Sequence, residues 1–288
     1  MTDNMNIQWY PGHMTKTRRQ IEADLKLVDA VCEIVDARIP VSSRNPDIDA
    51  ICGDKPRMIV LNRMDLADPA ATKKWAEYFR RKGMAVIATD CKSKKGISAF
   101  TPAARLACAE KLERDAKRGM NRPLRVMVVG IPNVGKSTLI NQISGRKSAK
   151  AENRPGVTRG KQWVMVDSGL QLLDTPGILW PKFEDPEVGM MLAYTGAVKE
   201  GVIDLEELAY RLMELLHKFY PQTLLERYKV EALEGTSGWQ LLEMAGRKRG
   251  YLVSGGEVNT ERMAKVLLDE FRSGKLGNFT LEMPEDMV

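Results

Sequence analysis

One segment constrains the fold of this chain more than any other, the octapeptide Gly130-Ile131-Pro132-Asn133-Val134-Gly135-Lys136-Ser137. It lies between an apolar run at residues 124–129 and a segment of helical character at residues 137–143. A strand, a glycine-containing loop and a helix in this order typically bind phosphate, because backbone N–H groups and the helix N-terminus face the negative charge. Lys136 is expected to reach the β- and γ-phosphates. The residues expected to contact a nucleotide here are Asn133, Val134, Gly135, Lys136, Ser137 and Thr138.

Short apolar runs alternate with helical segments through the first two thirds of the chain. The runs cover residues 30–35, 58–61, 84–88, 124–129, 163–166 and 170–173, and the expected helices cover 46–51, 70–82 and 97–118. This alternation predicts an α/β fold with a six-stranded, mostly parallel sheet. The last two runs are joined by Asp167-Ser168-Gly169 and predict a hairpin at one sheet edge.

After residue 186 the pattern becomes helical. Apolar residues with helical spacing mark residues 205–219, 239–245 and 262–271, and Pro221 and Gly255-Gly256 act as breaks. We therefore expect an N-terminal segment (1–20), a nucleotide-binding domain (21–186) and an all-helical domain (187–288).

Two further segments predict a magnesium site. Asp174-Thr175-Pro176-Gly177 ends an apolar run, so Asp174 can hold Mg²⁺ through water and the Gly177 N–H can sense the γ-phosphate. Thr158 lies in the loop between this segment and the phosphate-binding loop, where it supplies a second hydroxyl or is simply a turn residue. The expected metal-binding residues are Ser137, Thr158 and Asp174.

The base-reading motif precedes the phosphate-binding loop. Asn62-Arg63-Met64-Asp65 follows the second apolar run, as the Asn-Lys-x-Asp motif does in GTP-binding proteins. The Asp65 carboxylate would accept from the N1–H and 2-amino groups of guanine, which adenine cannot offer. Asp90 and Cys91 follow the third run, where a short loop caps the guanine oxygen. The motifs thus stand in a circularly permuted order, which preserves the packed sheet when the cut lies in exposed loops.

Composition excludes several classes of protein. The 288 residues carry a formal charge of +6, with 43% hydrophobic and 28% charged residues, as in an ordinary globular protein. The four cysteines show no zinc or disulfide spacing, which favours reduced thiols in the cytoplasm. We see no signal-like segment and no apolar run long enough to span a membrane.

With these motifs the chain resembles the ribosome biogenesis GTPase A (YlqF-type) family of circularly permuted GTPases. The resemblance rests on Gln8-Trp9-Tyr10-Pro11-Gly12-His13-Met14, Asp36-Ala37-Arg38-Ile39-Pro40, the octapeptide, Pro155-Gly156-Val157-Thr158, Asp174-Thr175-Pro176-Gly177-Ile178 and Phe271-Arg272-Ser273-Gly274-Lys275-Leu276-Gly277. It implies GTP hydrolysis to GDP, coupled to maturation of the large ribosomal subunit and contacts with its rRNA.

The catalytic group is harder to predict. Ile178, Leu179 and Trp180 follow the Asp-Thr-Pro-Gly segment, so the glutamine that often orients the attacking water is missing. We expect His13 to orient the water, and we expect Lys136 to be the second catalytic residue. The alternative for His13 is a structural or surface histidine. Asn133 either holds a K⁺ ion or only supports its loop.

Basic residues cluster at 16–19, 111–122, 146–161 and 247–249, which permits an RNA surface. We expect a cytoplasmic monomer without a membrane partner, whose low intrinsic turnover is stimulated by ribosomal subunits. Two alternatives stay open: a phosphate-loop ATPase or small-molecule kinase, and a nucleic-acid-binding protein that uses GTP as a structural ligand.

Overall fold

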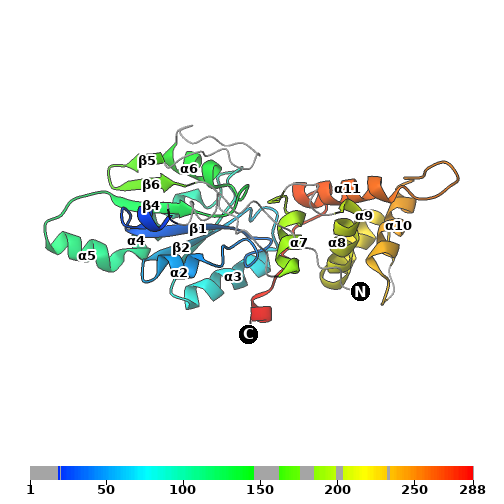
Figure 1. The fold of residues 1–288 in the computed structure, drawn as a ribbon, viewed down its shortest axis with the longest axis horizontal. Coiled ribbons are helices and arrows are strands. Elements are labelled where there is room, and N and C mark those ends of the chain that lie inside the picture. Colours follow the sequence, from blue (N-terminus) through cyan, green and yellow to red (C-terminus); the bar gives the residue numbers. More distant parts are fainter. Residues whose placement is uncertain are drawn as a thin grey trace.

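The computed structural model describes Arg19 and residues 21–145, 162–175, 185–198, 204–231 and 234–287. The molecule is elongated, with a sheet and its covering helices at one end and a group of helices at the other (Figure 1). The C-terminal end of the chain returns from the helices toward the sheet (Figure 1).

Six strands form one sheet in the order β3-β2-β1-β4-β6-β5. They are β1 (Ala30–Asp36), β2 (Arg57–Asn62), β3 (Ala85–Thr89), β4 (Leu124–Val129), β5 (Gln162–Asp167) and β6 (Leu170–Asp174). All neighbours are parallel except β5 and β6, which form the expected antiparallel edge pair. The predicted six-stranded, mostly parallel sheet is therefore confirmed.

Helices cover both faces of the sheet. On one face α4 (Phe100–Ala107) and α6 (Lys136–Ser144) pack in the same buried cluster as Cys32 and Val126. On the other face α2 (Ile48–Cys52) and α3 (Pro69–Arg81) cover the alternate residues of the strands, with the rings of Trp75 and Phe79 inside the core. Burial on both faces explains why these strands are continuous apolar runs in the sequence.

The single helix expected over residues 97–118 is wrong. The chain there forms η1 (Ile97–Ala99), α4 and α5 (Ala109–Lys117), and the break lies at Cys108, whose φ of −108° is not helical. The cause lies in packing, because α4 is held on the sheet by Phe100 and Ala104 whereas α5 buries no side chain. Its Lys111 pairs with Asp29, which precedes β1.

The second end of the molecule consists of helices and turns. Its helices are α7 (Pro186–Tyr194), α8 (Leu205–Phe219), α9 (Pro221–Tyr228), α10 (Gly238–Lys248) and α11 (Thr260–Ser273). The short η2 (Pro284–Met287) follows them and packs against α3. We call residues 185–276 within this end the helical region. The three helices expected from periodicity are present, and Pro221, expected as a break, begins α9 at its first turn.

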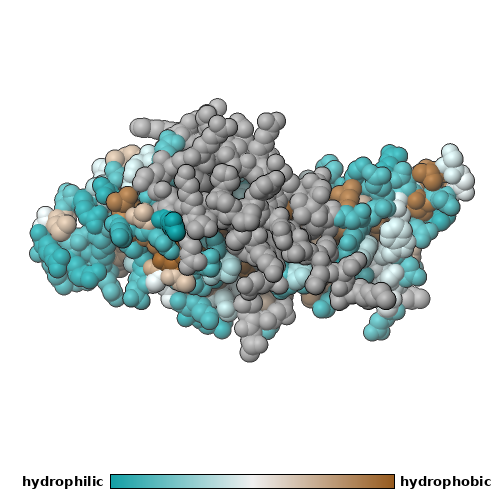
Figure 2. Space-filling model, viewed as in Figure 1, coloured by the Kyte–Doolittle hydropathy of each residue, from teal (hydrophilic) through white to brown (hydrophobic). Residues whose placement is uncertain are grey.

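The described helices include none with the length and apolar character of a membrane span. The surface seen in Figure 2 is mostly hydrophilic where it is coloured, with a brown patch at the far end over the loop between α10 and α11. Leu252 and Val253 are exposed in that loop.

Candidate nucleotide-binding site

The phosphate-binding loop joins β4 to α6, as the octapeptide predicts. Lys136 begins α6 and is buried, and its Nζ donates to the carbonyl oxygens of Gly130 at 3.0 Å and Ile131 at 2.8 Å. Burial lowers the pKa of Lys136 to about 8, against the opposing effect of the Asp174 carboxylate. The ammonium group is thus held inside the loop, where phosphate oxygens would complete its surroundings.

Asn62 joins the base-reading loop (residues 62–68) to the phosphate-binding loop (residues 130–137). Its buried side chain donates from Nδ2 to the Val134 carbonyl oxygen at 2.8 Å. Its Oδ1 accepts from Thr89 Oγ1 at 3.0 Å and Cys91 Sγ at 3.1 Å. Burial raises the pKa of the Cys91 thiol to about 11, which keeps the donating S–H protonated. One amide therefore connects three of the motifs found in the sequence.

Gly135 is required by this close approach. Its φ is +104°, a value that residues with a side chain rarely adopt, and a Cβ there would lie 2.4 Å from Asn62 Nδ2. Any larger residue would push the two loops apart.

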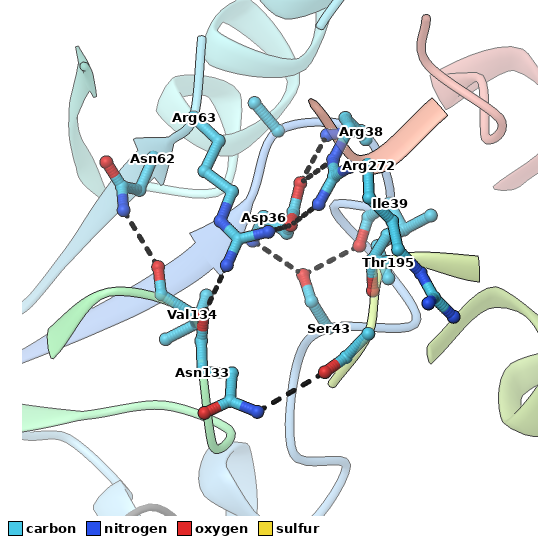
Figure 3. A network of polar contacts seen from close by, with 12 residues as sticks. Asp36, Arg38, Ile39, Ser43, Asn62, Arg63, Asn133, Val134, Thr195 and Arg272 are labelled. Carbon is cyan, nitrogen blue, oxygen red and sulfur yellow. Dashed lines mark hydrogen bonds and ion pairs between the residues drawn. The ribbon is translucent and has the colours of Figure 1, made fainter. Parts of the chain in front are cut away.

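Arg63 forms a second link between the same loops (Figure 3). Its guanidinium donates to the Asn133 carbonyl oxygen at 2.5 Å and lies 3.5 Å from an Asp36 carboxylate oxygen. Asp36 ends β1 and also binds Arg38 through two side-chain hydrogen bonds. The arginine that replaces the usual lysine therefore connects the loops through a charged network.

These segments enclose a cavity of about 380 Å³. From the expected site it is lined by Asn62, Arg63, Asp65, Asp90, Cys91, Asn133, Gly135 and Thr138. It is also lined by Lys92, which follows Asp90 and Cys91 in the base-capping loop, and by Leu66, Thr195, Gly196 and Arg272, which were not among the expected site residues.

The remaining expected residues lie close by or outside the described part of the chain. Met64 donates its N–H to the Thr89 carbonyl oxygen at 3.1 Å, and Ser137 follows Lys136 in α6. His13, Thr158 and Gly177 lie outside the described residues, so their expected roles stay predictions.

Asp174 has the surroundings of a metal-binding carboxylate. It ends β6 and is buried, and its Oδ1 has no hydrogen-bond partner among the described residues. Burial raises the pKa of Asp174 to about 6, although Lys136 and the Thr175 N–H lower it. A buried carboxylate oxygen without a partner is costly, and a divalent cation would remove that cost.

The helical region contributes one wall of the cavity. Asn133 Nδ2 donates to the Gly196 carbonyl oxygen at 3.3 Å, and the Asn133 amide oxygen points the other way (Figure 3). Arg272 of α11 donates to the carbonyl oxygens of Ala193 and Tyr194 at the end of α7, at 2.9 and 3.0 Å. Arg272 was visible in the sequence only as part of a family motif, and Thr195 and Gly196 gave no signal.

Comparison with known proteins agrees with this geometry. The family described as "50S ribosome-binding GTPase" matches residues 125–224, which begin in β4 and contain the phosphate-binding loop. The base-reading loop lies before the match, as the permuted order requires.

Similar proteins cover almost the whole chain. Ribosome biogenesis GTPase A from Priestia megaterium is 45% identical over 284 residues, with 98% of both chains covered, and that from Thermotoga maritima is 34% identical, with 98% of this chain and 96% of the relative covered. Mitochondrial ribosome-associated GTPase 1 from Mus musculus is 34% identical, with 96% of this chain and 90% of the relative covered.

Two solved structures of YlqF from T. maritima share the fold. The GDP-bound structure has a TM-score of 0.67 at 30% identity and covers 93% of this chain and 100% of its own. The GNP-bound structure has a TM-score of 0.65 at 30% identity, with 94% and 99% covered. The chain is therefore a GTPase, and it belongs to the ribosome biogenesis GTPase A family.

Proposed function

We propose that the chain alternates between GTP- and GDP-bound states on a precursor of the large ribosomal subunit and contacts its rRNA. The observation that carries the proposal is the single cavity shared by Asp65, Asp90 and Asn133. The base-reading loop and the phosphate-binding loop are hydrogen-bonded to each other at this cavity through Asn62 and Arg63. A guanine nucleotide carries a base and a phosphate chain in one molecule, so it could contact both loops at once.

Asp65 is the proposed reader of guanine. Its carboxylate lines the cavity and would accept from the N1–H and the 2-amino group of the base. Asp90 and Cys91 lie on the same cavity, where backbone N–H groups of their loop would face the guanine oxygen. Arg63 and Met64 complete the base-reading loop.

Ser137, Thr158 and Asp174 are the proposed Mg²⁺ site. The buried Asp174 oxygen, which has no partner among the described residues, fits this role, because Mg²⁺ prefers carboxylate and hydroxyl oxygens and shares its shell with phosphates. When bound, the ion neutralises charge on the phosphate oxygens. Lys136 supplies a second positive charge from within the loop.

His13 and Asn133 are the proposed contributors to hydrolysis. His13 would orient the attacking water, and a His13→Ala variant that keeps the normal rate on ribosomal subunits would contradict this. The Asn133 amide oxygen would contact a K⁺ ion, because the amide nitrogen already bonds to Gly196. Equal turnover in KCl and NaCl would exclude that role.

The helical region is the proposed RNA-binding part of a cytoplasmic monomer. Arg247 and Lys248 are exposed in the last turn of α10, and Trp239 is exposed in the first turn of the same helix. Arg249 pairs with Glu270 and stacks near Tyr228, so its role is partly structural. Steep weakening of binding with salt is the expected signature.

The base assignment is tested by Asp65→Asn. The amide can donate to the 2-oxo group of xanthine but no longer offers a carboxylate to guanine, so GDP affinity should fall by about a hundredfold while XDP affinity rises. Dissociation constants for GDP, XDP and ADP measure this. Asp54→Asn, at an exposed position before β2, is the matched control. An unchanged preference for GDP over XDP would contradict the assignment of Asp65 as the base reader.

Turnover with and without purified large ribosomal subunits tests the partner. We expect stimulation by the large subunit and little effect of the small one. Turnover that neither subunit changes would contradict the proposed partner.

A further inference from the structure

The last residues of the chain lie against the base-reading loop. After α11 the chain continues without helix or strand through residues 278–282, which we call the C-terminal strap. Asn278 Nδ2 donates to the carbonyl oxygens of Asp65 at 2.8 Å and Ala67 at 3.3 Å. The Phe279 N–H donates to the Leu66 carbonyl oxygen at 3.0 Å. Three successive carbonyl groups of the loop thus bind two successive residues of the strap.

We propose that the C-terminal strap is a positioning element of the guanine site, which holds the Asp65 backbone so that its carboxylate faces the base. The inference rests on the proposed role of Asp65 and adds a requirement to it. The strap does not line the cavity: it holds the backbone carbonyl groups of the loop, as a supporting shell fixes a binding residue.

Thr280 anchors the end of the same loop. Its fully buried hydroxyl accepts from the Asp68 N–H at 3.2 Å and donates to the Ala37 carbonyl oxygen at 3.2 Å. Asp68 is also the N-cap of α3. The hydroxyl therefore joins the end of the base-reading loop to the end of β1, and its loss would leave two buried polar groups without partners.

The strap is held firmly at its far end. Leu281 donates its N–H to the Arg38 carbonyl oxygen at 2.8 Å, and the Glu282 carboxylate accepts from the N–H groups of Val41 and Ser42 at 2.6 and 3.0 Å. The Trp75 indole donates to the Glu282 carbonyl oxygen at 2.8 Å. These bonds connect the strap to the segment that follows β1 and to α3, the helix that follows the base-reading loop.

The strap is also joined to the helical region. The Phe279 ring is buried between Phe271 of α11, at 5.9 Å between centroids, and Tyr220, at 5.0 Å. The Tyr220 hydroxyl donates to the Thr280 carbonyl oxygen and accepts from the Thr280 N–H. A movement of α11 would therefore pull on the base-reading loop, so a partner that displaces the helical region would weaken guanine binding, and guanine would weaken that partner's binding reciprocally.

Asn278 provides the sharpest test, because it is exposed and its replacement does not disturb the core. Asn278→Ala should speed release of GDP by about fivefold, since it removes two hydrogen bonds at a partly exposed position. Asn278→Asp keeps the size but places a carboxylate against two carbonyl oxygens, so it should be worse than alanine. If the side chain acted only through its volume, the aspartate variant would resemble the wild type.

Base selectivity separates positioning from general loosening. IDP lacks the 2-amino group, so a misplaced Asp65 should lower the affinity for GDP more than that for IDP. The dissociation constant for IDP divided by that for GDP should therefore decrease in Asn278→Asp and in Thr280→Val. Thr280→Ser keeps the hydroxyl and should restore the ratio. Glu285→Ala, which removes an exposed ion pair between η2 and Lys74, should change nothing.

Two measurements test whether the strap positions Asp65. They are the rate of release of fluorescent GDP by stopped flow and the dissociation constants for GDP and IDP. If Asn278→Asp and Thr280→Val keep the wild-type release rate and ratio within twofold, the inference is wrong, even if Asp65→Asn still switches to xanthine. If Asp65→Asn fails to switch while the strap variants weaken nucleotide binding with an unchanged ratio, the base assignment fails and the strap serves only as a tether.

Discussion

Arg38 has a guanidinium group without any exposed surface, an uncommon position for a permanent charge. Its Nε and Nη2 donate to the two Asp36 carboxylate oxygens at 3.0 and 2.8 Å, and the group lies 5.5 Å from the Phe271 ring centre. Burial alone would raise the pKa of Asp36, but Arg38 and Arg63 hold it below its usual value. The pair thus links the end of β1 to the base-reading loop on one side and to α11 on the other.

Arg38→Met should destabilise the protein by about 3 kcal/mol, because it leaves the buried Asp36 carboxylate with the backbone N–H of residue 38 and the more distant Arg63. Urea unfolding measures this, and Lys117→Met, at an exposed ion pair on α5, should cost less than about 0.5 kcal/mol. A loss below 1 kcal/mol in Arg38→Met would mean that Asp36 is well satisfied without it.

The same pair predicts a pH dependence. The folded-state pKa of Asp36 lies below its unfolded value, so its contribution to stability is complete above the unfolded pKa and is lost as the pH falls through the folded one. Arg38→Met raises the folded pKa. The loss of stability on acidification should therefore be smaller in the variant than in the wild type, in unfolding curves measured at matched pH values.

At the scale of the elements, the contact between α8 and α10 leaves no space for a side chain at Gly238. A Cβ on Gly238, the first residue of α10, would lie 2.0 Å from the Tyr210 carbonyl oxygen and 2.7 Å from Glu214 Cγ. The Gly238 N–H also donates to Glu214 at 3.1 Å. Because the nearest obstacle is backbone, a side chain cannot be accommodated by a change of rotamer.

Gly238→Ala should therefore cost about 3 kcal/mol in the free energy of unfolding, as overpacking does when the neighbours cannot move. Circular dichroism during urea unfolding measures the loss. Glu243→Ala, on the outer part of the same helix, should stay within about 0.5 kcal/mol. A Gly238→Ala variant as stable as this control would show that α10 can shift freely along α8.

Elements with a local signal were predictable from the sequence. The strand β4, the phosphate-binding loop and α6 follow from apolar residues and glycines within about twenty positions. Helix α7 lacked such a signal, because Met190, Met191, Leu192, Ala193 and Tyr194 are all buried and leave no polar side to reveal the helical period. Helix α9 is short and begins at a proline that the pattern alone marks as a break.

The residues of the site also fall into two groups, those with a local sequence pattern and those that only tertiary packing brings to the cavity. Asn62, Asp65 and the phosphate-binding loop are recognisable because their chemistry requires particular residue types at fixed spacing. Arg272 and Thr195 enter the cavity only through the packing of α11 and α7, which no local pattern encodes. The strap is the extreme case, since Asn278 and Asp65 are 213 positions apart and the strap has no repeating pattern of its own.

At the scale of the whole molecule, the cavity lies where the sheet meets the helical region. Asp65 and Asn133 line it from the sheet side, and Thr195, Gly196 and Arg272 line it from the helical side. A nucleotide bound there would contact both ends of the elongated molecule, so its binding free energy should stabilise both (Figure 1).

Hydrogen exchange measures this coupling. With GDP at a hundred times its dissociation constant, stabilisation of the native state is about 2.7 kcal/mol, or roughly a hundredfold slowing of amides that exchange only by global unfolding. The N–H groups of Gly196, Phe279 and Leu281 are hydrogen-bonded to Ala193, Leu66 and Arg38, and should slow together with those of the phosphate-binding loop. The Val253 N–H, in the loop between α10 and α11, is the internal control and should exchange by local opening at an unchanged rate.

Protection confined to the sheet would mean that the helical region opens independently of the nucleotide. Joint protection would mean that any partner able to separate the two ends must overcome nucleotide binding, which is how a GTPase can link its bound nucleotide to the release of a large partner.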